Sequence, residues 1–504
     1  MNRRHFFKSS VGAAVALSFH QSLIRAALGD GGTTVKHDVH AVTGDGRQVT
    51  LPQAAVQELA DSLRANLILP VGEGYDQARL VLNPEINQFP ALVVQPEGAA
   101  DVQLAVQFAR QENLLTAVKC GGHAFSGIST CNGGMQIDLS LMRHVRVDPV
   151  KQTAWVAGGS LLGEMDFEAM ANGLVTTAGS VSHTGVGGLT LGGGFGRLAR
   201  KYGLSCDNVL SVDIVTADGR LRRASAEENP DLYWAVRGGG GNFGVVTSFE
   251  YRLHELETIT AGLALYPPEM IRDMFRFYRD YTSTAPDTVT AMAGIAQAPP
   301  GSPLEGGQVG FLQACHSGAA SEGARLLQPI KAFGPPAIDL IGVMPYTTLQ
   351  TLSDANFPVG NRNYWRSNFL TELSDQAIDI ILERAGGMPR NAHSALFFEH
   401  MGGAVGRVGP EDTAFSNRDA TFNFTVLAGW TDPAEDETHA NWTRSFGDAM
   451  KTLATGAGYV NYMMDDEGSA RVRATYERNF DRLVAVKRKY DPTNFFSGNQ
   501  NIAP

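Results

Sequence analysis

Between about Leu80 and Leu253, short apolar runs alternate with segments of helical periodicity. The run "ALVVQP" predicts a strand that ends at Pro96, and "GAADVQLAVQFARQEN" repeats apolar residues at the spacing of an amphipathic helix. "LLTAVK" predicts the next strand, and further strands are predicted in "GMQIDLS", "VRVDPVKQTAWVAGG" (a hairpin around Asp148-Pro149), "VLSVDIVTADGRLRRA" and "GVVTSFEYRL". This order of elements predicts a mixed α+β domain.

The rest of the chain divides into further parts. From about His254 to Gly458, longer segments such as "PEMIRDMFRFYRDY" and "NFTVLAGWTDP" predict helices and strands. From Tyr459 onward, "SARVRATYERNFDRLVAVKRKY" predicts one helix, which Asp491-Pro492 ends. With 504 residues, the chain is too long for a single hydrophobic core. We therefore expect boundaries that separate residues 1–29, 30–79, 80–254, 255–458 and 459–504.

The first 29 residues, "MNRRHFFKSSVGAAVALSFHQSLIRAALG", differ from the rest of the chain. Arg3-Arg4 and Lys8 precede an apolar run from about Val11 to Phe19, which is far shorter than the ~18–20 residues that span a bilayer. The segment resembles a twin-arginine export signal; a basic tail is the alternative. Such a signal implies a periplasmic or secreted protein that has no membrane attachment after cleavage and that folds around a cofactor before export.

Composition and charge narrow the possible partners. Apolar residues make up 43% of the chain and charged residues 18%, and the net charge of −11 disfavours nucleic acid or an anionic membrane as a partner. Glycine accounts for 56 of 504 residues, above the usual share of about 7%. It gathers in "LGGGFG" and "RGGGGNFG", which predicts loops where backbones approach closely.

Both glycine runs contain a formal dinucleotide-binding fingerprint. The pattern G-x-G-x-x-G runs from Gly239 to Gly244, and G-x-G-x-x-A runs from Gly194 to Ala199. A Rossmann site needs a buried strand before the first glycine and a helix after it. The first run is instead followed by the strand-like "VVTSFEYRL", and only "LTL" precedes the second. We therefore reject a Rossmann site, although consecutive glycine amides can still bind a diphosphate.

Five blocks in order resemble one family: "VVQPEGAADVQLAVQFAR", "KCGGHAFSG", "SHTGVGGLTLGGGFGRLARKYGLSCDNVLSVDIVTADG", "NPDLYWAVRGGGGNFGVV" and "YDPTNFFSGNQNIAP". They resemble the FAD-linked oxidoreductases of the vanillyl-alcohol oxidase/p-cresol methylhydroxylase (PCMH) superfamily, and within it the berberine-bridge-enzyme-like branch. The resemblance covers about residues 80–504 and implies FAD as the cofactor. It implies an α+β fold: a two-part PCMH-type FAD-binding domain closed by the C-terminal segment, plus an α+β substrate domain with an antiparallel sheet.

The resemblance also assigns the cofactor-binding residues. The loop "KCGGHAFSG" would wrap the FAD diphosphate, and His123 would bond covalently to the 8α-methyl carbon of the flavin; a histidine that only packs is the alternative. Some members have a second attachment through a cysteine at the place of Val181, so a single attachment is implied here. The other residues implied to bind FAD are Lys119, Cys120, Gly121, Gly122, Ala124, Thr184, Gly185, Val186, Gly187, Gly188, Gly192, Gly193, Gly194, Asp207, Asn208, Gly244, Val245, Val246 and Asn499.

Catalysis in the family combines hydride transfer from a substrate carbon to the flavin with removal of a proton by a base. In relatives that oxidise alcohols or oligosaccharides, the base is a tyrosine before the C-terminal helix, and "GYVNYMMDDEG" offers Tyr462, with Tyr459 as the lesser candidate. A tyrosine base needs its pKa lowered from about 10. His183 is assigned to the cavity wall, and Thr184 leaves oxidase and dehydrogenase behaviour both open.

Other polar and aromatic residues have alternative interpretations. Glu399, His400 and Arg418 could face the substrate, but we expect surface salt bridges for them. Tyr364-Trp365 and Trp430 could stack on a sugar or belong to the core.

The four cysteines, at positions 120, 131, 206 and 315, form no metal-binding pattern with histidine, so no metal site is expected. A Cys120–Cys131 disulfide is possible in an oxidising periplasm, and a buried free thiol is the favoured alternative.

The resemblance implies an FAD-dependent oxidase that uses O2 and takes hydride from a hydroxylated substrate such as a sugar, an oligosaccharide or a secondary alcohol. Three alternatives stay open: oxidation of a C–N bond in an amine or alkaloid-like compound, a dehydrogenase with another acceptor, and an FAD-bearing binding protein without turnover. The oligomeric state is not predicted.

Overall fold

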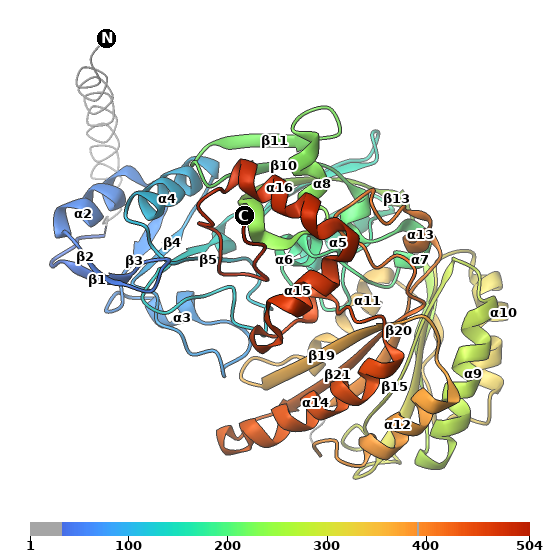
Figure 1. Ribbon diagram of the computed structural model, residues 1–504. Helices are drawn as coiled ribbons and strands as arrows, with labels where there is room; N and C mark the ends of the chain where they lie inside the picture. Colours follow the sequence, from blue (N-terminus) through green and yellow to red (C-terminus); the bar gives the residue numbers. More distant parts are fainter. Residues whose placement is uncertain (1–32, 391–392) are drawn as a thin grey trace.

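A computed structural model of the chain describes residues 33–390 and 393–504. The expected export signal lies outside these residues. In Figure 1 the N-terminal elements, in blue, and the largest sheet with its helices, in yellow to orange, lie on opposite sides of the view, and the last helices of the chain, in red, lie near its centre. Over the described ranges, no helix is long and apolar enough to cross a bilayer.

The N-terminal part contains a four-stranded sheet in the order β3-β4-β6-β5. β4 (Leu92–Gln95) and β5 (Thr116–Lys119) both pair with β6 (Met135–Asp138) in parallel, and β3 (Asn66–Ile68) pairs with β4 antiparallel. The predicted amphipathic helix is confirmed as α4 (Ala99–Gln111), whose apolar side chains join the core of this sheet. The other elements of this part are β1 (Val39–Val42), β2 (Gln48–Leu51), α2 (Gln53–Ser62) and α3 (Tyr75–Arg79).

The second part contains a five-stranded antiparallel sheet in the order β11-β10-β12-β8-β7. The predicted hairpin is confirmed, because Asp148 pairs with Thr153. The run that ends at Gly244 leads into a strand and not into a helix, as expected. The strands are β7 (Val145–Asp148), β8 (Thr153–Ala157), β10 (Val209–Val215), β11 (Leu221–Ser225) and β12 (Val245–Arg252). The helices are α5 (Leu162–Met170), α6 (Val186–Leu191), α7 (Ala199–Tyr202) and α8 (Pro230–Val236), and β9 (Leu174–Val175) pairs with β13 (His254–Glu255).

The third part is an eight-stranded antiparallel sheet in the order β17-β14-β16-β15-β20-β21-β19, with β18 paired to β14. Four helices cover one of its faces (Figure 1), and their apolar side chains share one core with that face. The opposite face closes the cavity described below. The strands are β14 (Ile259–Tyr266), β15 (Val289–Gln297), β16 (Gln308–His316), β17 (Ile338–Asp339), β18 (Gly342–Met344), β19 (Arg362–Leu370), β20 (Ala395–His400) and β21 (Phe422–Trp430). The covering helices are α9 (Ile271–Thr284), α10 (Ala320–Ala332), α12 (Asp375–Ala385) and α14 (Asp436–Met450); α11 (Tyr346–Thr351) and α13 (Ala404–Arg407) lie elsewhere.

The C-terminal segment packs back on the second part. The single helix predicted there is wrong, because α15 (Gly468–Tyr476) and α16 (Phe480–Tyr490) are separated at Glu477, whose φ is +47°. The break turns Asn479 inward, where its side-chain amide donates to the carbonyl oxygens of Pro410 and Thr413. These contacts lie outside the helix, so helical periodicity could not predict the break.

A buried ion pair joins the second part to the third. The guanidinium of Arg418, whose side chain is fully buried, donates to both carboxylate oxygens of Asp207 at 2.7 and 2.8 Å. The expected surface salt bridge of Arg418 is therefore wrong. Asp207 and Asn208 also stabilise the turn that follows α7, since Asp207 accepts from the amide of Leu204 and Asn208 donates to the carbonyl oxygen of Tyr202.

Removing one member of this pair should destabilise the fold. Arg418→Met leaves the carboxylate of Asp207 buried without its cation, and we expect the free energy of unfolding to fall by about 3–5 kcal/mol, measured as a lower melting temperature. Arg473→Met removes an exposed pair with Asp481 and is the control, which should cost less than about 1 kcal/mol. Equal melting temperatures of the two variants would contradict this account.

Candidate active site

A cavity of about 1000 Å³ lies between the glycine-rich loops and the third sheet. One side is lined by the loop at residues 120–126 and by Thr184, Gly185, Gly187, Gly188 and Leu189 at the start of α6, and side chains of β14, β15, β16 and β20 line the other. The C-terminal segment contributes residues 459–464 and 498–500. The cavity therefore brings together all the parts of the described chain.

Two of the glycine loops meet backbone to backbone. A Cβ on Gly121 would lie 2.4 Å from the amide nitrogen of Gly185, and a Cβ on Gly185 would lie 2.4 Å from the amide nitrogen of Gly121. Gly188 and Gly241 line the cavity, and a Cβ on either would meet no atom within 4 Å. This cradle of backbone without side chains fits the close approach that a diphosphate needs.

His123 follows the cradle and lines the cavity. Its Nε2 lies 2.7 Å from Nδ1 of His183, and its Nδ1 lies 3.4 Å from the hydroxyl of Thr184. Desolvation, with a smaller contribution from His183, lowers the pKa of His123 to about 3. The imidazole is therefore neutral at physiological pH, which is the nucleophilic form. His183, expected on the cavity wall, contacts His123 without being one of the residues that line the cavity.

Most residues implied to bind FAD do line the cavity. These are Cys120, Gly121, Gly122, His123, Ala124, Thr184, Gly185, Gly187, Gly188, Gly244, Val245, Val246 and Asn499. Val181 also lines it, at the place where some relatives carry a cysteine.

The remaining implied residues lie behind the cavity wall. Lys119 is buried beside Asp138, and Val186 belongs to the core of the second part. Asp207 and Asn208 stabilise the turn described above. Cβ atoms on Gly192, Gly193 and Gly194 would meet Asn461, Phe415 and Ser205, respectively. Lys119, Val186, Gly192, Gly193, Gly194, Asp207 and Asn208 are therefore not among the residues that line the cavity.

Tyr462 lies on a 3-10 turn (Val460–Tyr462) that packs against the third sheet, and its hydroxyl interacts with the carboxylate of Glu399 of β20. Desolvation and the charge of Glu399 raise the pKa of Tyr462 well above 10. Desolvation also raises the pKa of Glu399 to about 7, although the Asn423 amide and Arg197 favour its ionised form. The lowered pKa that a tyrosine base requires is therefore not provided by this environment.

Glu399 is a cavity residue, and its expected place on the surface is wrong. Its exposed fraction is 4%, and the Asn423 amide donates to its carboxylate at 2.7 Å. Strand alternation explains this position, because Phe397 and Glu399 face the cavity while Phe398 faces the helical core. His400 is buried as well and contacts Arg200. The continuous apolar run "ALFF" directly before Glu399, typical of a strand that is covered on both faces, was the signal that could have placed Glu399 inside.

Arg197 is a cavity residue that the sequence did not reveal. Only 7% of it is exposed, its Nη2 donates to Ser353 at 3.3 Å, and its Nε has no hydrogen-bond partner among the described residues. Its charge acts on both Glu399 and Tyr462. Arg197 lies within the quoted block "LGGGFGRLARKYG", but that pattern assigned it no role, and packing against the third sheet brings it to the cavity.

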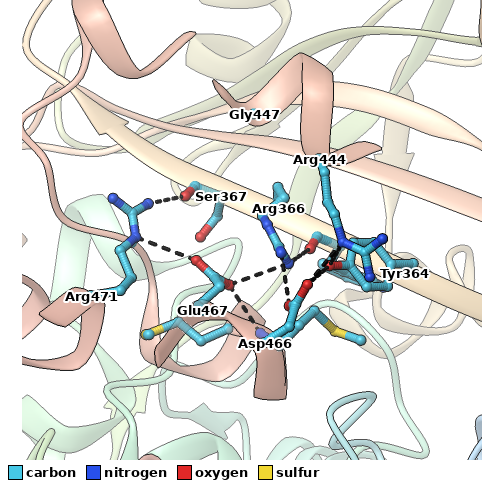
Figure 2. A network of polar contacts seen from close by, with 12 residues as sticks. Tyr364, Arg366, Ser367, Arg444, Gly447, Asp466, Glu467 and Arg471 are labelled. Carbon is cyan, nitrogen blue, oxygen red and sulfur yellow. Dashed lines mark hydrogen bonds and ion pairs between the residues drawn. The ribbon is translucent and has the colours of Figure 1, made fainter. Parts of the chain in front are cut away.

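A polar network holds the segment that carries Tyr462 (Figure 2). Asp466 accepts hydrogen bonds from Tyr364, Arg366 and Arg444 at 2.6, 2.7 and 2.8 Å. Glu467 forms a further ion pair with Arg366. The network joins the C-terminal segment to β19 and α14 and thereby positions Tyr462 against the third sheet.

Among the aromatic residues considered for sugar stacking, Trp365 lines the cavity, and its ring centroid is 4.4 Å from that of Tyr462. Tyr364 belongs to the polar network, and Trp430 is buried and donates to Asp436. All four cysteines are free thiols, so the favoured alternative to a disulfide holds. Within the described part of the chain, no group of three His, Cys, Asp or Glu residues could hold a metal ion.

Comparison with known proteins identifies the family of this chain. Residues 90–225 match the family model "FAD binding domain", and residues 458–503 match "Berberine and berberine like". A FAD-linked oxidoreductase of Dictyostelium discoideum is 30% identical over 452 residues, which cover 89% of this chain and 97% of that protein. The chain belongs to the berberine-bridge-enzyme-like FAD-linked oxidoreductases.

Two further relatives agree with this family. (R)-6-hydroxynicotine oxidase of Paenarthrobacter nicotinovorans is 29% identical, with 88% of this chain and 97% of that protein covered. The crystal structure of 6-hydroxy-D-nicotine oxidase from Arthrobacter nicotinovorans has a TM-score of 0.80 and 28% identity, and the match covers 88% and 98% of the two chains. The expected fold class is confirmed, and this berberine-bridge-enzyme-like protein is an oxidoreductase with FAD as its cofactor.

The contact of the two glycine loops should be essential for cofactor binding. In Gly121→Ala the added methyl group would collide with the backbone of Gly185, so we expect the loops to separate and FAD retained after gel filtration to fall at least tenfold. The control is Gly386→Ala, where the nearest atom to an added Cβ is 3.9 Å away. Full FAD content in Gly121→Ala would contradict the assignment of this cradle.

Proposed function

We propose that this berberine-bridge-enzyme-like protein is an oxidase that takes hydride from a substrate carbon bearing a hydroxyl group, with O2 as the electron acceptor. The observation that supports it is the pair Tyr462–Glu399, which faces the same cavity as the glycine cradle and His123. The (R)-6-hydroxynicotine oxidase relative supports O2 as the acceptor. Because the 6-hydroxynicotine in the name of this relative is an amine, oxidation of a C–N bond is the second candidate.

The residues of the cavity fit FAD, which when bound would accept two electrons from the substrate and deliver them to O2. The cradle at Gly121 and Gly185 would hold the phosphates, and His123 would anchor the ring through a covalent bond. The neutral imidazole of His123 supports this role. Val181 has no thiol, which supports a single attachment.

We propose that Glu399 is the final proton acceptor and that Tyr462 transfers the proton. Tyr462 alone would be a poor base, because its pKa is raised well above 10. When Glu399 is ionised, the Tyr462 hydroxyl can donate its proton to that carboxylate as it takes the proton of the substrate. The groups whose charge or hydrogen bonds act on this pair are Arg197, Asn423, Tyr278 and Tyr459.

Export by the twin-arginine route to the periplasm stays a proposal, supported by residues 1–29 of the sequence. The early insertion of a cofactor that this route permits agrees with the FAD-binding site.

Covalent attachment can be tested by acid precipitation. The yellow colour of the wild-type protein should stay with the precipitated polypeptide, whereas His123→Ala should release its FAD to the supernatant. His40→Ala, at an exposed histidine, is the matched control and should retain the colour. Release of the colour from the wild-type protein would remove the covalent attachment.

The proton pathway predicts a pH dependence. Because Glu399 must be ionised and its pKa is about 7, the rate of anaerobic flavin reduction by substrate should rise as the pH increases through about 7. Glu399→Gln should slow reduction and remove this rise, and Tyr462→Phe should slow it about 10²–10⁴-fold. Stopped-flow absorbance measures the rate, and Glu73→Gln, at an exposed glutamate, is the control. The same pH profile in Glu399→Gln and the wild type would disprove the role of Glu399.

A further inference from the structure

The wall of the cavity opposite the glycine cradle is largely apolar. It is one face of the third sheet, and side chains at alternating positions of four neighbouring strands line the cavity. They include Leu263, Leu265, Met292, Val309, Phe311 and Phe397. These side chains form a continuous surface, because their strands are adjacent in the sheet.

Two polar side chains of this wall, Gln313 and Glu399, lie in one row, and a third, Gln297, lies at the far end of β15. Met292 pairs with Gln313 on one neighbouring strand and with Glu399 on the other. In the next row that faces the cavity, Gly294 pairs with Phe311, and a Cβ on Gly294 would lie 2.6 Å from the Phe311 ring. This glycine therefore makes room for an aromatic ring at a position where a polar side chain could otherwise stand. The wall therefore has Gln313 and Glu399 at the end where the proton acceptor lies, and the side chains beyond them are apolar as far as Gln297 at the far end of β15.

Large apolar side chains are also exposed at the rim of the cavity. Leu340 and Leu352 both line the cavity, although 61% and 49% of their surfaces are exposed. Met344 and Phe357 line it beside them. Large apolar side chains that remain exposed around a cavity are typical of a site that binds an apolar ligand.

We propose that the substrate has an apolar body, aromatic or alkyl, and carries the hydroxyl or amino group to be oxidised at one end. This inference rests on the proposed function and names the substrate class of the same site. The body would lie on the wall around Phe311 and Leu265, and the polar group would lie at Tyr462 and Glu399.

A sugar does not fit this wall. It carries a hydroxyl on nearly every carbon, and each hydroxyl buried without a partner would weaken binding roughly five- to hundredfold. Each methylene buried on the wall would instead strengthen binding roughly three- to fourfold. Of the hydroxylated substrates considered above, the wall therefore favours a secondary alcohol over a sugar or oligosaccharide.

The proposed oxidation transfers a hydride and one proton from the substrate to groups at this site. The substrate loses a C–H bond and an O–H or N–H bond, and a C=O or C=N bond forms. The hydride takes two electrons to the bound FAD, and the proton passes through Tyr462 to Glu399. O2 is the final oxidant and is reduced with two protons to hydrogen peroxide.

The substrate class can be tested with the FAD-loaded enzyme and two homologous series. Alkan-2-ols from butan-2-ol to octan-2-ol, the matching 2-aminoalkanes, D-glucose and cellobiose are added anaerobically, and bleaching of the flavin is followed. We expect the half-saturating concentration in the alcohol or the amine series to fall roughly threefold per added methylene. A flat series, or bleaching by the sugars at lower concentrations, would overturn the inference and leave the proposed oxidase function standing.

Product analogues separate binding from turnover. 4-Alkylcyclohexanones have no hydroxyl or amino group to oxidise, and D-glucono-1,5-lactone lacks the anomeric hydroxyl of glucose; their binding is measured by perturbation of the flavin spectrum. The ketones should bind more tightly as the alkyl group lengthens, whereas the lactone should not bind more tightly than cyclohexanone. If the ketones bind in this order but no alcohol or amine reduces the flavin, the proposed function is refuted and the apolar substrate class is supported. If the lactone binds more tightly than the ketones, the apolar substrate class is refuted.

Variants of the wall and the rim provide an independent test. Leu265→Asn, on the wall, and Leu340→Asn, on the exposed rim, should each raise the dissociation constant of 4-propylcyclohexanone at least threefold. Leu340→Asn should fold normally, because this side chain is largely exposed, so its effect on binding can be measured even if Leu265→Asn does not fold. The control is Val150→Asn, which changes an exposed side chain in the turn after β7 and should leave the dissociation constant unchanged. Unchanged binding in both Leu265→Asn and Leu340→Asn would overturn the inference.

Discussion

The contact between the backbones of Gly121 and Gly185 is the constraint on which the site depends. Each glycine would place a Cβ within 2.4 Å of the other's amide nitrogen, so the two loops can meet only where side chains are missing. Because His123 lies two residues beyond Gly121, and Thr184 directly precedes Gly185, this contact also brings the anchoring histidine beside its neighbours on the second loop. One backbone approach thus builds the cradle and orients the residue that would tether the cofactor.

Strand alternation gives the third sheet two different faces. Residues such as Phe398 pack under the covering helices and stabilise the fold, whereas Phe397 and Phe311 line the cavity. Apolar side chains on the cavity face are not needed for the helical core. Exposure of these apolar side chains to water is unfavourable, and an apolar ligand that covers them removes this cost. The cavity face therefore selects apolar ligands, while the opposite face stabilises the fold.

The reactive end of the cavity depends on contacts between distant segments. Glu399 comes from the third sheet, Tyr462 from the C-terminal segment and Arg197 from the loop before α7. Burying a carboxylate is costly unless it is paired, and perturbed carboxylates of this kind concentrate at functional sites. The polar network at Asp466 keeps the C-terminal segment in place, so that Tyr462 stays close to Glu399.

The sequence by itself determined the alternation of strands and helices, the β7–β8 hairpin, the family and the loop that carries His123, because each is encoded by local periodicity or by a contiguous motif. Only the tertiary structure decided that Glu399 and Arg418 are buried and that Arg197 reaches the cavity. It also decided that the predicted C-terminal helix breaks at Glu477. These outcomes depend on partners far away along the chain, since a charged side chain stays inside only where another part of the fold supplies a counter-charge or a hydrogen bond.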